Sequence, residues 1–316
     1  MTPFFQQYDS IGTPNGTWIK PGGRVAAYVR STGLQEGDDL FAMSGNLVSS
    51  INAGCARCRP GKNDIVYVLD NHTESITGAD GWSNLVAGTQ IISAGRRGGS
   101  SNPTVTFGTS TAAQILVDVA DVSIVGLNLV MNGLDNIVLP ISVTAAGFTL
   151  ANCDITYQTA AGVAQPVDGI ALGAGANYAT IAHNRILSED ATDQNTGSVI
   201  LVGTGAAQGL VGVDIVGNHI IAATPGDTDG IIHVASTGRG VRIVGNELHQ
   251  LASTGDTAIR ADNVACRGSI LYNFIRLTED LTAPNGIILG GGTWLVAQNF
   301  VSAGNGFAVQ TPATDS

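Results

Sequence analysis

The chain has 316 residues with a net charge of −11; 42 residues are glycine, 44% are hydrophobic and only 12% are charged. This composition excludes intrinsic disorder, which needs low hydrophobicity and high charge, and the irregular glycine spacing excludes collagen. The sequence also lacks the run of about 18 apolar residues that a membrane-spanning helix requires. A turn-rich globular or solenoid protein with a large apolar interior remains.

The N-terminal 60 residues divide into two predicted segments. Residues 1–38 contain three prolines, several glycines and one strand-like piece at 25–32, and we predict an extended arm that docks rather than folds alone. Residues 39–60 carry apolar side chains at helical spacing before a Pro-Gly pair, which predicts a helix that caps the core. The side chains at helical spacing are Leu47, Val48, Ile51 and Cys55.

The four cysteines are Cys55, Cys58, Cys153 and Cys266. The first two form a C-x-x-C pair, which can be redox-active or half of a zinc site. A zinc site would need a second pair at similar spacing, and a thioredoxin-like site would need a βαβ context, neither of which follows. We therefore interpret the pair as free thiols at the end of a helix.

A repeated phrase begins near residue 119: a short apolar strand, an asparagine, and then another apolar or β-branched residue. The asparagines are Asn128, Asn152, Asn184, Asn218, Asn246, Asn273 and Asn299, spaced 24, 32, 34, 28, 27 and 26 residues apart. A second strand-like phrase runs in phase with the first, from 168–172 to 305–310. Earlier runs at 65–70, 89–95, 104–108 and 114–119 have the character of the first coils.

This repeat predicts an all-β fold, a single-stranded right-handed parallel β-helix (solenoid) over residues 61–316. No amphipathic helix fits between units, which disfavours leucine-rich repeats and βαβ layouts, and the units are too short for propeller blades. Alternate Val, Ile and Leu side chains would point inward and stack on their counterparts in adjacent coils. The recurrent asparagine would adopt the left-handed backbone region and bond the next coil's amide as a ladder.

Candidate catalytic carboxylates come from the second phrase. Asp229 and Asp256 occupy similar positions in adjacent coils and would stack about one rung apart, with Asp168 at the same phase two coils earlier. Paired carboxylates suit a glycosidase or lyase. Aspartate at a strand start is also ordinary turn chemistry, and Asn285 and Asn305 fill the same slot later, which favours the turn interpretation.

Histidines and arginines add little to this constellation. Arg260 and His233 lie close to these aspartates in sequence, and His183 and His219 flank repeat asparagines in neighbouring coils. A metal would need more ligands than these, and we expect His72 to bond a cap or turn. We therefore assign no catalytic, cofactor-binding or metal residue, expect no cofactor, and consider an enzyme less favoured than a structural protein.

The order of helix, Gly/Asn turn, IVYV strand and strand-Asn coils resembles the pectate-lyase-like β-helix superfamily. More narrowly, residues 46–92 (NLVSSINAGCARCRPGKNDIVYVLDNHTESI through WSNLVAGTQII) resemble β-helical structural proteins of tailed bacteriophages, a group that includes capsid-decorating (cement) proteins and tailspikes. The resemblance implies a virion protein that forms a homotrimer. It leaves head and tail locations open.

Two functions follow as expectations. The first is a capsid decoration (cement) protein on the virion surface, assembled in the host cytoplasm, which contacts the major capsid protein and stabilises the head shell as a trimer. The alternative is a tailspike-like protein that binds or cleaves a host-surface polysaccharide. Tailspikes generally add particle-binding and C-terminal trimerisation domains, and here the coils occupy nearly all of the chain, which favours decoration.

The acidic balance of residues 101–316, with 17 acidic and six basic side chains, argues against a nucleic-acid partner. The N-terminus lacks a secretory signal, and we expect no membrane partner.

Overall fold

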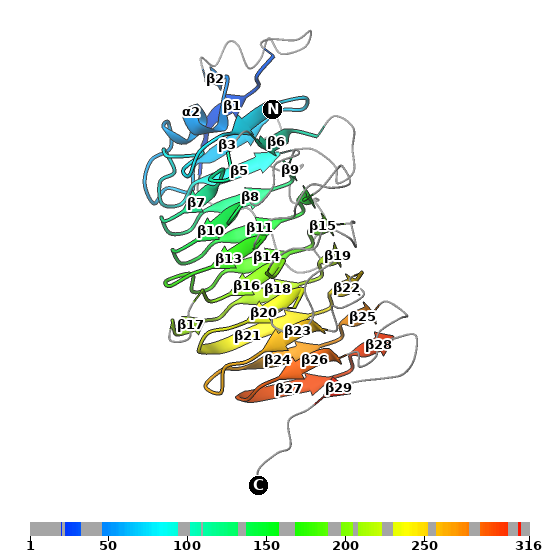
Figure 1. Cartoon of the computed structure of the whole chain (residues 1–316). Coiled ribbons are helices and arrows are strands. Elements are labelled where there is room, and N and C mark those ends of the chain that lie inside the picture. The colour runs from blue at the N-terminus through cyan, green and yellow to red at the C-terminus, as the bar shows by residue number, and fades with distance from the viewer. Residues whose placement is uncertain are drawn as a thin grey trace, which may run out of the picture.

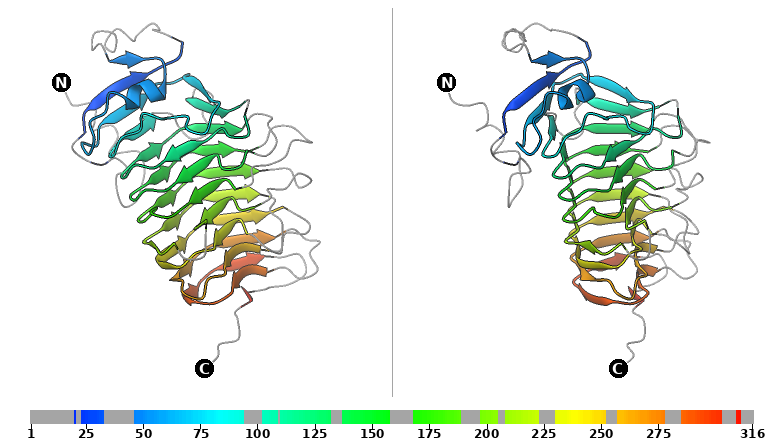
Figure 2. Two further views of the ribbon diagram at one scale, coloured as in Figure 1. Left: turned by 60° about the vertical axis from the view of Figure 1, so that its left-hand side comes forward. Right: turned by 90° about the vertical axis from the view of Figure 1, so that its left-hand side faces the viewer.

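The computed structural model is a parallel β-solenoid, in which short strands of successive coils stack along one axis (Figure 1). Figure 2 shows the same stack from two further sides, with the N-terminal strands at one end and the last strands at the other. The fold is all-β with almost no helix, as the sequence predicts. The structure describes residues 20, 23–32, 46–93, 102–108, 110–131, 137–157, 168–188, 197–204, 208–222, 230–251, 257–277, 285–302 and 309–310.

Three parallel sheets form the sides of the solenoid, and the full coils contribute strands to sheets A, B and C in that order, with one coil adding a second short strand, β17, to sheet A. Sheet A contains β1 (Val25–Val29), β2 (Leu47–Val48), β3 (Ile65–Val68), β5 (Gln90–Ser93), β8 (Ser123–Val125), β11 (Thr149–Ala151), β14 (Thr180–Ala182), β17 (Leu210–Val211), β18 (Asp214–Val216), β21 (Gly238–Val244), β24 (Arg267–Leu271) and β27 (Thr293–Ala297). Sheet B contains β4 (Thr73–Ile76), β6 (Thr104–Phe107), β9 (Asn128–Met131), β12 (Asp154–Thr156), β15 (Arg185–Ser188), β19 (His219–Ala222), β22 (Glu247–Gln250), β25 (Phe274–Leu277) and β28 (Phe300–Ser302). Sheet C contains β7 (Ile115–Val117), β10 (Ile141–Val143), β13 (Ile170–Leu172), β16 (Ile200–Val202), β20 (Ile232–Val234), β23 (Thr257–Ala261), β26 (Asn285–Leu289) and β29 (Val309–Gln310).

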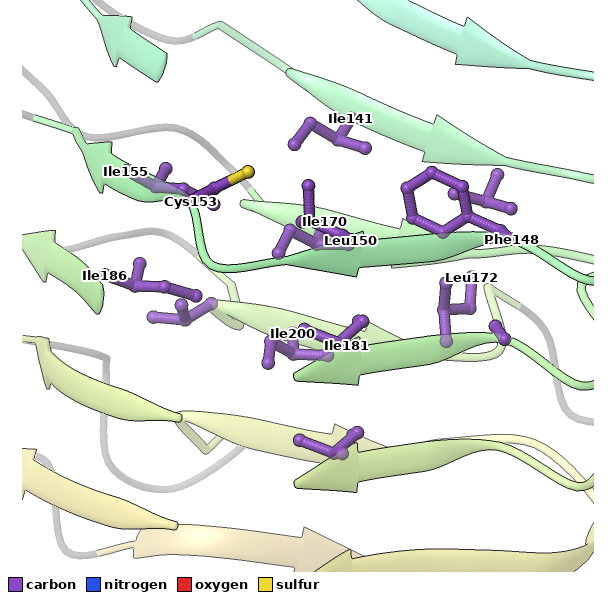
Figure 3. Close-up of a cluster of buried hydrophobic side chains, with 14 of the residues drawn as sticks. Ile141, Phe148, Leu150, Cys153, Ile155, Ile170, Leu172, Ile181, Ile186 and Ile200 are labelled. Carbon is purple, nitrogen blue, oxygen red and sulfur yellow. The ribbon is translucent and has the colours of Figure 1, made fainter. Parts of the chain in front are cut away.

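The core is a column of aliphatic side chains that repeats from coil to coil. Leu150 of sheet A pairs in register with Ile181 of the next coil, and Ile170 of sheet C pairs with Ile200. These side chains are fully buried between the sheets, as Figure 3 shows. Because successive strand residues alternate between faces, one side chain in two reaches this core, which explains how short strands with few charges bury so much apolar surface.

The N-terminal arm contributes a strand to the solenoid. Residues 25–29 form β1, which pairs in parallel with β3, so sheet A begins well before residue 61, where the sequence analysis starts the solenoid. Lys20 also contacts the turn before β8, which lies two strands beyond β3 in sheet A, and its Nζ lies 2.8 Å from Oδ1 of Asp121 there. Docking of the arm is thus seen at residues 20 and 23–32, and the rest of the predicted arm lies outside the described residues.

The capping helix is shorter than the apolar spacing predicts. In the described part of 39–60, only α2 (Ile51–Cys55) is helical, and Leu47 and Val48 form strand β2 instead. Ser50 caps the helix, since its Oγ accepts a hydrogen bond from Ala53 N–H at 3.2 Å. Ile51 and Cys55 are fully buried, so the short helix still packs its apolar face on the first strands.

The turn between sheets A and B carries an asparagine ladder, defined here as Asn184, Asn218, Asn246, Asn273 and Asn299. The Oδ1 of each of the last four accepts the backbone N–H and the Nδ2 of the ladder asparagine one coil earlier, at 2.9–3.0 Å. Each Nδ2 also donates to a main-chain carbonyl of the preceding coil at 2.8–2.9 Å. Every amide atom that faces the interior therefore has a partner, which is the condition for burying asparagine.

Two of the seven repeat asparagines lie outside this ladder, which corrects the prediction. Asn128 is one residue late and begins strand β9, and Asn152 is one residue early, with a left-handed φ of +54°. Leu127 and Cys153 occupy the ladder position in these coils, and Cys153 N–H donates to Asn184 Oδ1 at 3.0 Å. The left-handed residue is the one before the ladder asparagine, not the asparagine itself.

Candidate functional site

The outer face of sheet B carries a column of charged, histidine and aromatic side chains. The residue that follows the ladder position begins each strand and pairs in register with its counterparts along the solenoid. This column contains Asp154, Arg185, His219, Glu247, Phe274 and Phe300. Along the solenoid axis, the first two side chains of this column are an aspartate and an arginine, the next two are a histidine and a glutamate, and the last two are phenylalanines.

His219, Glu247 and His249 form a three-residue cluster on this face. His219 and Glu247 are register partners on β19 and β22, and His249 lies two residues beyond Glu247 on the same side of the strand. One potential ligand atom from each residue lies within 4.8 Å of the other two. Nε2 of His249 is 3.1 Å from Oε1 of Glu247, and the two imidazole centroids are 5.6 Å apart. Two imidazoles and a carboxylate form a donor set that suits zinc and related divalent metals.

The neighbours of the cluster set its electrostatic surroundings. Arg185 pairs in register with His219 on one side, and Arg276 pairs with His249 on the other. Arg276 is exposed, so its guanidinium can extend into solvent. Phe274 follows Glu247 in the column and stacks on Phe300, with ring centroids 5.1 Å apart and an interplanar angle of 8°.

A second cluster lies on sheet C and joins His233, Arg260 and Asp262. His233 on β20 and Arg260 on β23 are register partners in adjacent coils. Nε2 of His233 lies 2.9 Å from Oδ2 of Asp262, and Nε of Arg260 donates to both carboxylate oxygens at 2.7 and 2.9 Å. Asp262 is the residue that the sequence analysis missed. Because the arginine engages both of its oxygens, the arrangement is an ion-pair network that ties two coils together.

The predicted carboxylate pair gains no support as a catalytic pair. Asp229, Asp256 and Asn305 lie outside the described residues, and Asn285 begins strand β26. Asp168 does what the turn interpretation predicts, since its Oδ1 accepts a hydrogen bond from Ser198 N–H at 2.8 Å in the next coil. No catalytic residue is assigned among the described aspartates.

His72 takes part in the N-terminal cap, as expected. Its Nε2 lies 3.2 Å from Oε2 of Glu74, and the same oxygen accepts the N–H of Ile51, the first residue of α2. Oε1 of Glu74 accepts a hydrogen bond from Nε1 of Trp82 at 3.0 Å. Glu74 therefore links the helix, the first strand of sheet B and a buried tryptophan, which is a structural role.

The C-x-x-C pair consists of free, buried thiols, as the sequence analysis interprets it. Burial raises the pKa of Cys55 well above its ordinary value, and burial raises the pKa of Cys58 to about 11. Both side chains are therefore neutral thiols near pH 7, and the thiolate that nucleophilic or metal-binding chemistry requires is disfavoured.

His183 and His219, which flank repeat asparagines in neighbouring coils, occupy different positions in their coils. His183 occupies the left-handed corner position before Asn184, at a φ of +55°, whereas His219 follows its ladder asparagine and begins a strand. His219 instead meets Glu247 and His249 of the next coil. Aligning the coils on the ladder asparagines would have revealed this, because the residue after Asn218 then falls beside the residue after Asn246.

Comparisons with protein-family models, curated proteins and solved structures find no significant match to this chain. Among the described residues, no helix has the length and apolar character needed to cross a bilayer.

Proposed function

We propose that the chain is a structural protein of a tailed-phage particle, which assembles as a homotrimer and decorates the capsid surface by contacting the major capsid protein. The resemblance of residues 46–92 to phage β-helical proteins supports a role as a component of a phage particle. The solenoid agrees with the β-helical fold that this resemblance implies. The asparagine ladder and the aliphatic column tie each coil to the next along the axis, which suits a structural protein. A host-surface glycan is the partner in the alternative function.

The observation that carries the proposal is a concentration of exposed apolar side chains at the C-terminal coils. Five of the eight exposed large hydrophobic residues of the described chain lie between residues 264 and 300. They are Val264, Tyr272, Phe274, Leu295 and Phe300, and we call them the apolar end. Phe274 and Phe300 are in contact on sheet B, Leu295 lies on sheet A, and Tyr272 and Val264 lie in turns of the same last coils. Exposed apolar residues in such numbers commonly mark association surfaces.

The last described strands of the three sheets lie at the same end of the molecule. Strands β27, β28 and β29 are the last described strands of their sheets, so their outer edges have no following strand within the described residues. The edge strands of a sheet are usually covered because they pair readily with other chains. A second and a third copy of the chain that cover the apolar end would bury both features.

Glycan binding remains a second candidate because of one observation. The stacked rings of Phe274 and Phe300 are 42% and 51% exposed, and they adjoin the polar Glu247 in the same column. Exposed aromatic faces beside a carboxylate suit a sugar. In a trimer that buries these rings, the platform would be closed.

The test combines oligomeric state with location. Light scattering after size exclusion is expected to give three times the 32.2 kDa chain mass, and the double variant Leu295→Ser/Phe300→Ser is expected to shift toward monomer. Val138→Ser, also exposed but far from the apolar end in sequence, is the matched control and should remain trimeric. Cryo-electron microscopy of particles should then show the chain across the head. A monomeric wild-type chain or a few copies at one vertex would contradict decoration by a trimer, and binding to host glycan arrays would favour the alternative.

A further inference from the structure

We propose that His219, Glu247 and His249 bind one divalent transition-metal ion of the zinc class on the outer face of sheet B. The proposal rests on the placement of two imidazoles and one carboxylate from two adjacent coils, and it is independent of the proposed particle role. Three protein ligands of this type leave a further coordination position for water or an external ligand, as in open zinc sites.

The distances are compatible with metal binding after small side-chain movements. The three donor atoms lie within 4.8 Å of one another. In a tetrahedral zinc site with bonds of about 2.0–2.1 Å, donors are separated by roughly 3.3 Å. Rotations of the side chains close this difference, and the hydrogen bond between His249 and Glu247 gives way to two bonds with the metal.

The backbone behind the cluster is held in place by the ladder. Asn218 immediately precedes His219, and Asn246 immediately precedes Glu247. The backbone N–H and Nδ2 of Asn218 both donate to Asn246 Oδ1 at 3.0 Å, which fixes the spacing of the two strands at the point where the ligands begin. Such preorganisation reduces the entropy lost when a metal draws the three side chains together.

Accessibility also favours an ion with an open position. The Glu247 side chain is 48% exposed and the His249 side chain is 20% exposed, so a metal can enter from solvent and retain water. Arg185 and Arg276 flank the cluster and oppose a cation, but the Glu247 carboxylate contributes a compensating negative charge within bonding reach. This balance predicts moderate affinity rather than the tight binding of a buried structural site.

Isothermal titration calorimetry with zinc tests the proposal on the full chain after treatment with a chelator. We expect about one zinc ion per chain, and we expect His219→Gln, Glu247→Gln and His249→Gln each to weaken binding by about a hundredfold or more. Loss of a direct ligand should cost at least as much as the 10- to 100-fold loss seen for outer-shell partners. Far-UV circular dichroism checks that each variant keeps its sheet content.

Two other histidine substitutions provide matched controls. His183→Gln changes a corner residue one coil earlier, where Gln298 shows that glutamine fits the same left-handed position. His233→Gln removes a histidine from the separate cluster on sheet C. Both controls should bind zinc as the wild-type chain does, and equal weakening by His183→Gln would contradict the assignment.

X-ray absorption on the wild-type zinc complex gives a second measurement that needs no variant. The expected spectrum has two imidazole ligands with the remaining ligands oxygen. The absence of stoichiometric zinc binding, or a first shell without imidazole, would overturn the proposal.

Discussion

Truncation of a central ladder asparagine, Asn246→Ala, provides the sharpest test of what holds the coils together. The Asn246 amide makes four hydrogen bonds: Nδ2 donates to Asn273 Oδ1 and to the Ile215 carbonyl, both at 2.9 Å, and Oδ1 accepts two bonds from Asn218 at 3.0 Å. At about 1 kcal/mol net for each bond, their loss lowers the free energy of unfolding by about 4 kcal/mol. The substitution also leaves the buried N–H of Asn218 without its acceptor, and this cost keeps the loss in the free energy of unfolding close to that value.

The matched control is Asn128→Ala. Asn128 belongs to the same repeated phrase in the sequence, but it lies one residue past the ladder, and its Nδ2 makes a hydrogen bond of 3.2 Å with Thr104 Oγ1. We expect this substitution to cost about 1 kcal/mol or less. The comparison therefore separates the ladder from the mere presence of asparagine in the repeat.

Urea unfolding followed by far-UV circular dichroism measures both variants against the wild-type chain. A third variant, Asn246→Asp, keeps the shape but directs a carboxylate at Asn273 Oδ1 and the Ile215 carbonyl, and it should be more destabilising than alanine at pH 7 because the charge is buried against two acceptors. The reasoning fails if Asn128→Ala costs as much as Asn246→Ala, or if Asn246→Ala costs less than about 1 kcal/mol.

Three further predictions concern the N-terminal cap and the corners. Hydrogen bonds from Arg59 to the buried Asp64 hold the pKa of that carboxyl well below its usual range. Asp64 therefore stabilises the fold above about pH 4, and this contribution is lost as the pH falls further. In urea unfolding, Asp64→Asn should lower the free energy of unfolding by about 3 kcal/mol at pH 7, and the difference from the wild-type chain should shrink at pH 3. Cys55 and Cys58 should react with a thiol reagent at pH 7.5 only after denaturation, and rapid labelling of the native chain would contradict their neutral, buried state. Gly217→Ala places a Cβ at a φ of +63° and 2.6 Å from Nδ1 of His183, so urea unfolding is expected to show a loss of about 1–2 kcal/mol. An unchanged urea midpoint would show that the corner relaxes without cost.

The solenoid could be predicted from the sequence because its causes are local. Alternation of apolar residues and a turn signal every 24–34 residues are visible in the chain, and these two patterns determine which faces are buried. The ladder was only partly predictable. Asn128, Asn152 and Asn184 follow similar strands, yet a shift of one residue changes the asparagine from a strand residue, to a left-handed corner, to a ladder member. Only the three-dimensional register distinguishes these positions.

The cap shows a different limit. Leu47, Val48, Ile51 and Cys55 have helical spacing, but the sheet edge formed by β1 pairs with Leu47 and Val48 and draws them into a strand. The hydrogen bonds of an edge strand outweigh the weak propensity of a short helix, which is marginal without tertiary support. The spacing therefore holds for Ile51 and Cys55, which are both helical and buried, whereas Leu47 and Val48 are partly buried strand residues.

The metal-ligand cluster was out of reach for the same reason as the ladder. His219 and Glu247 are 28 residues apart, and their contact depends on the register of two coils, which the sequence shows only when the coils are aligned on the correct asparagines. His183 of the preceding coil also flanks a repeat asparagine, but the structure places it at a left-handed corner. In a solenoid, neighbours on the outer face belong to different repeats, so a site is assembled from residues that no local motif contains.

The same corner therefore serves two purposes that place different demands on the sequence. The inward residue must be an asparagine wherever the ladder continues, because its amide bonds both neighbouring coils. The next residue points outward, and its backbone position is fixed by that ladder while its side chain bears none of the ladder's hydrogen bonds. Substitutions such as His219→Gln and Glu247→Gln can therefore alter surface chemistry with little effect on the stacking behind them. This separation explains how one repeat can present arginine, histidine, glutamate and phenylalanine in successive coils of the same sheet.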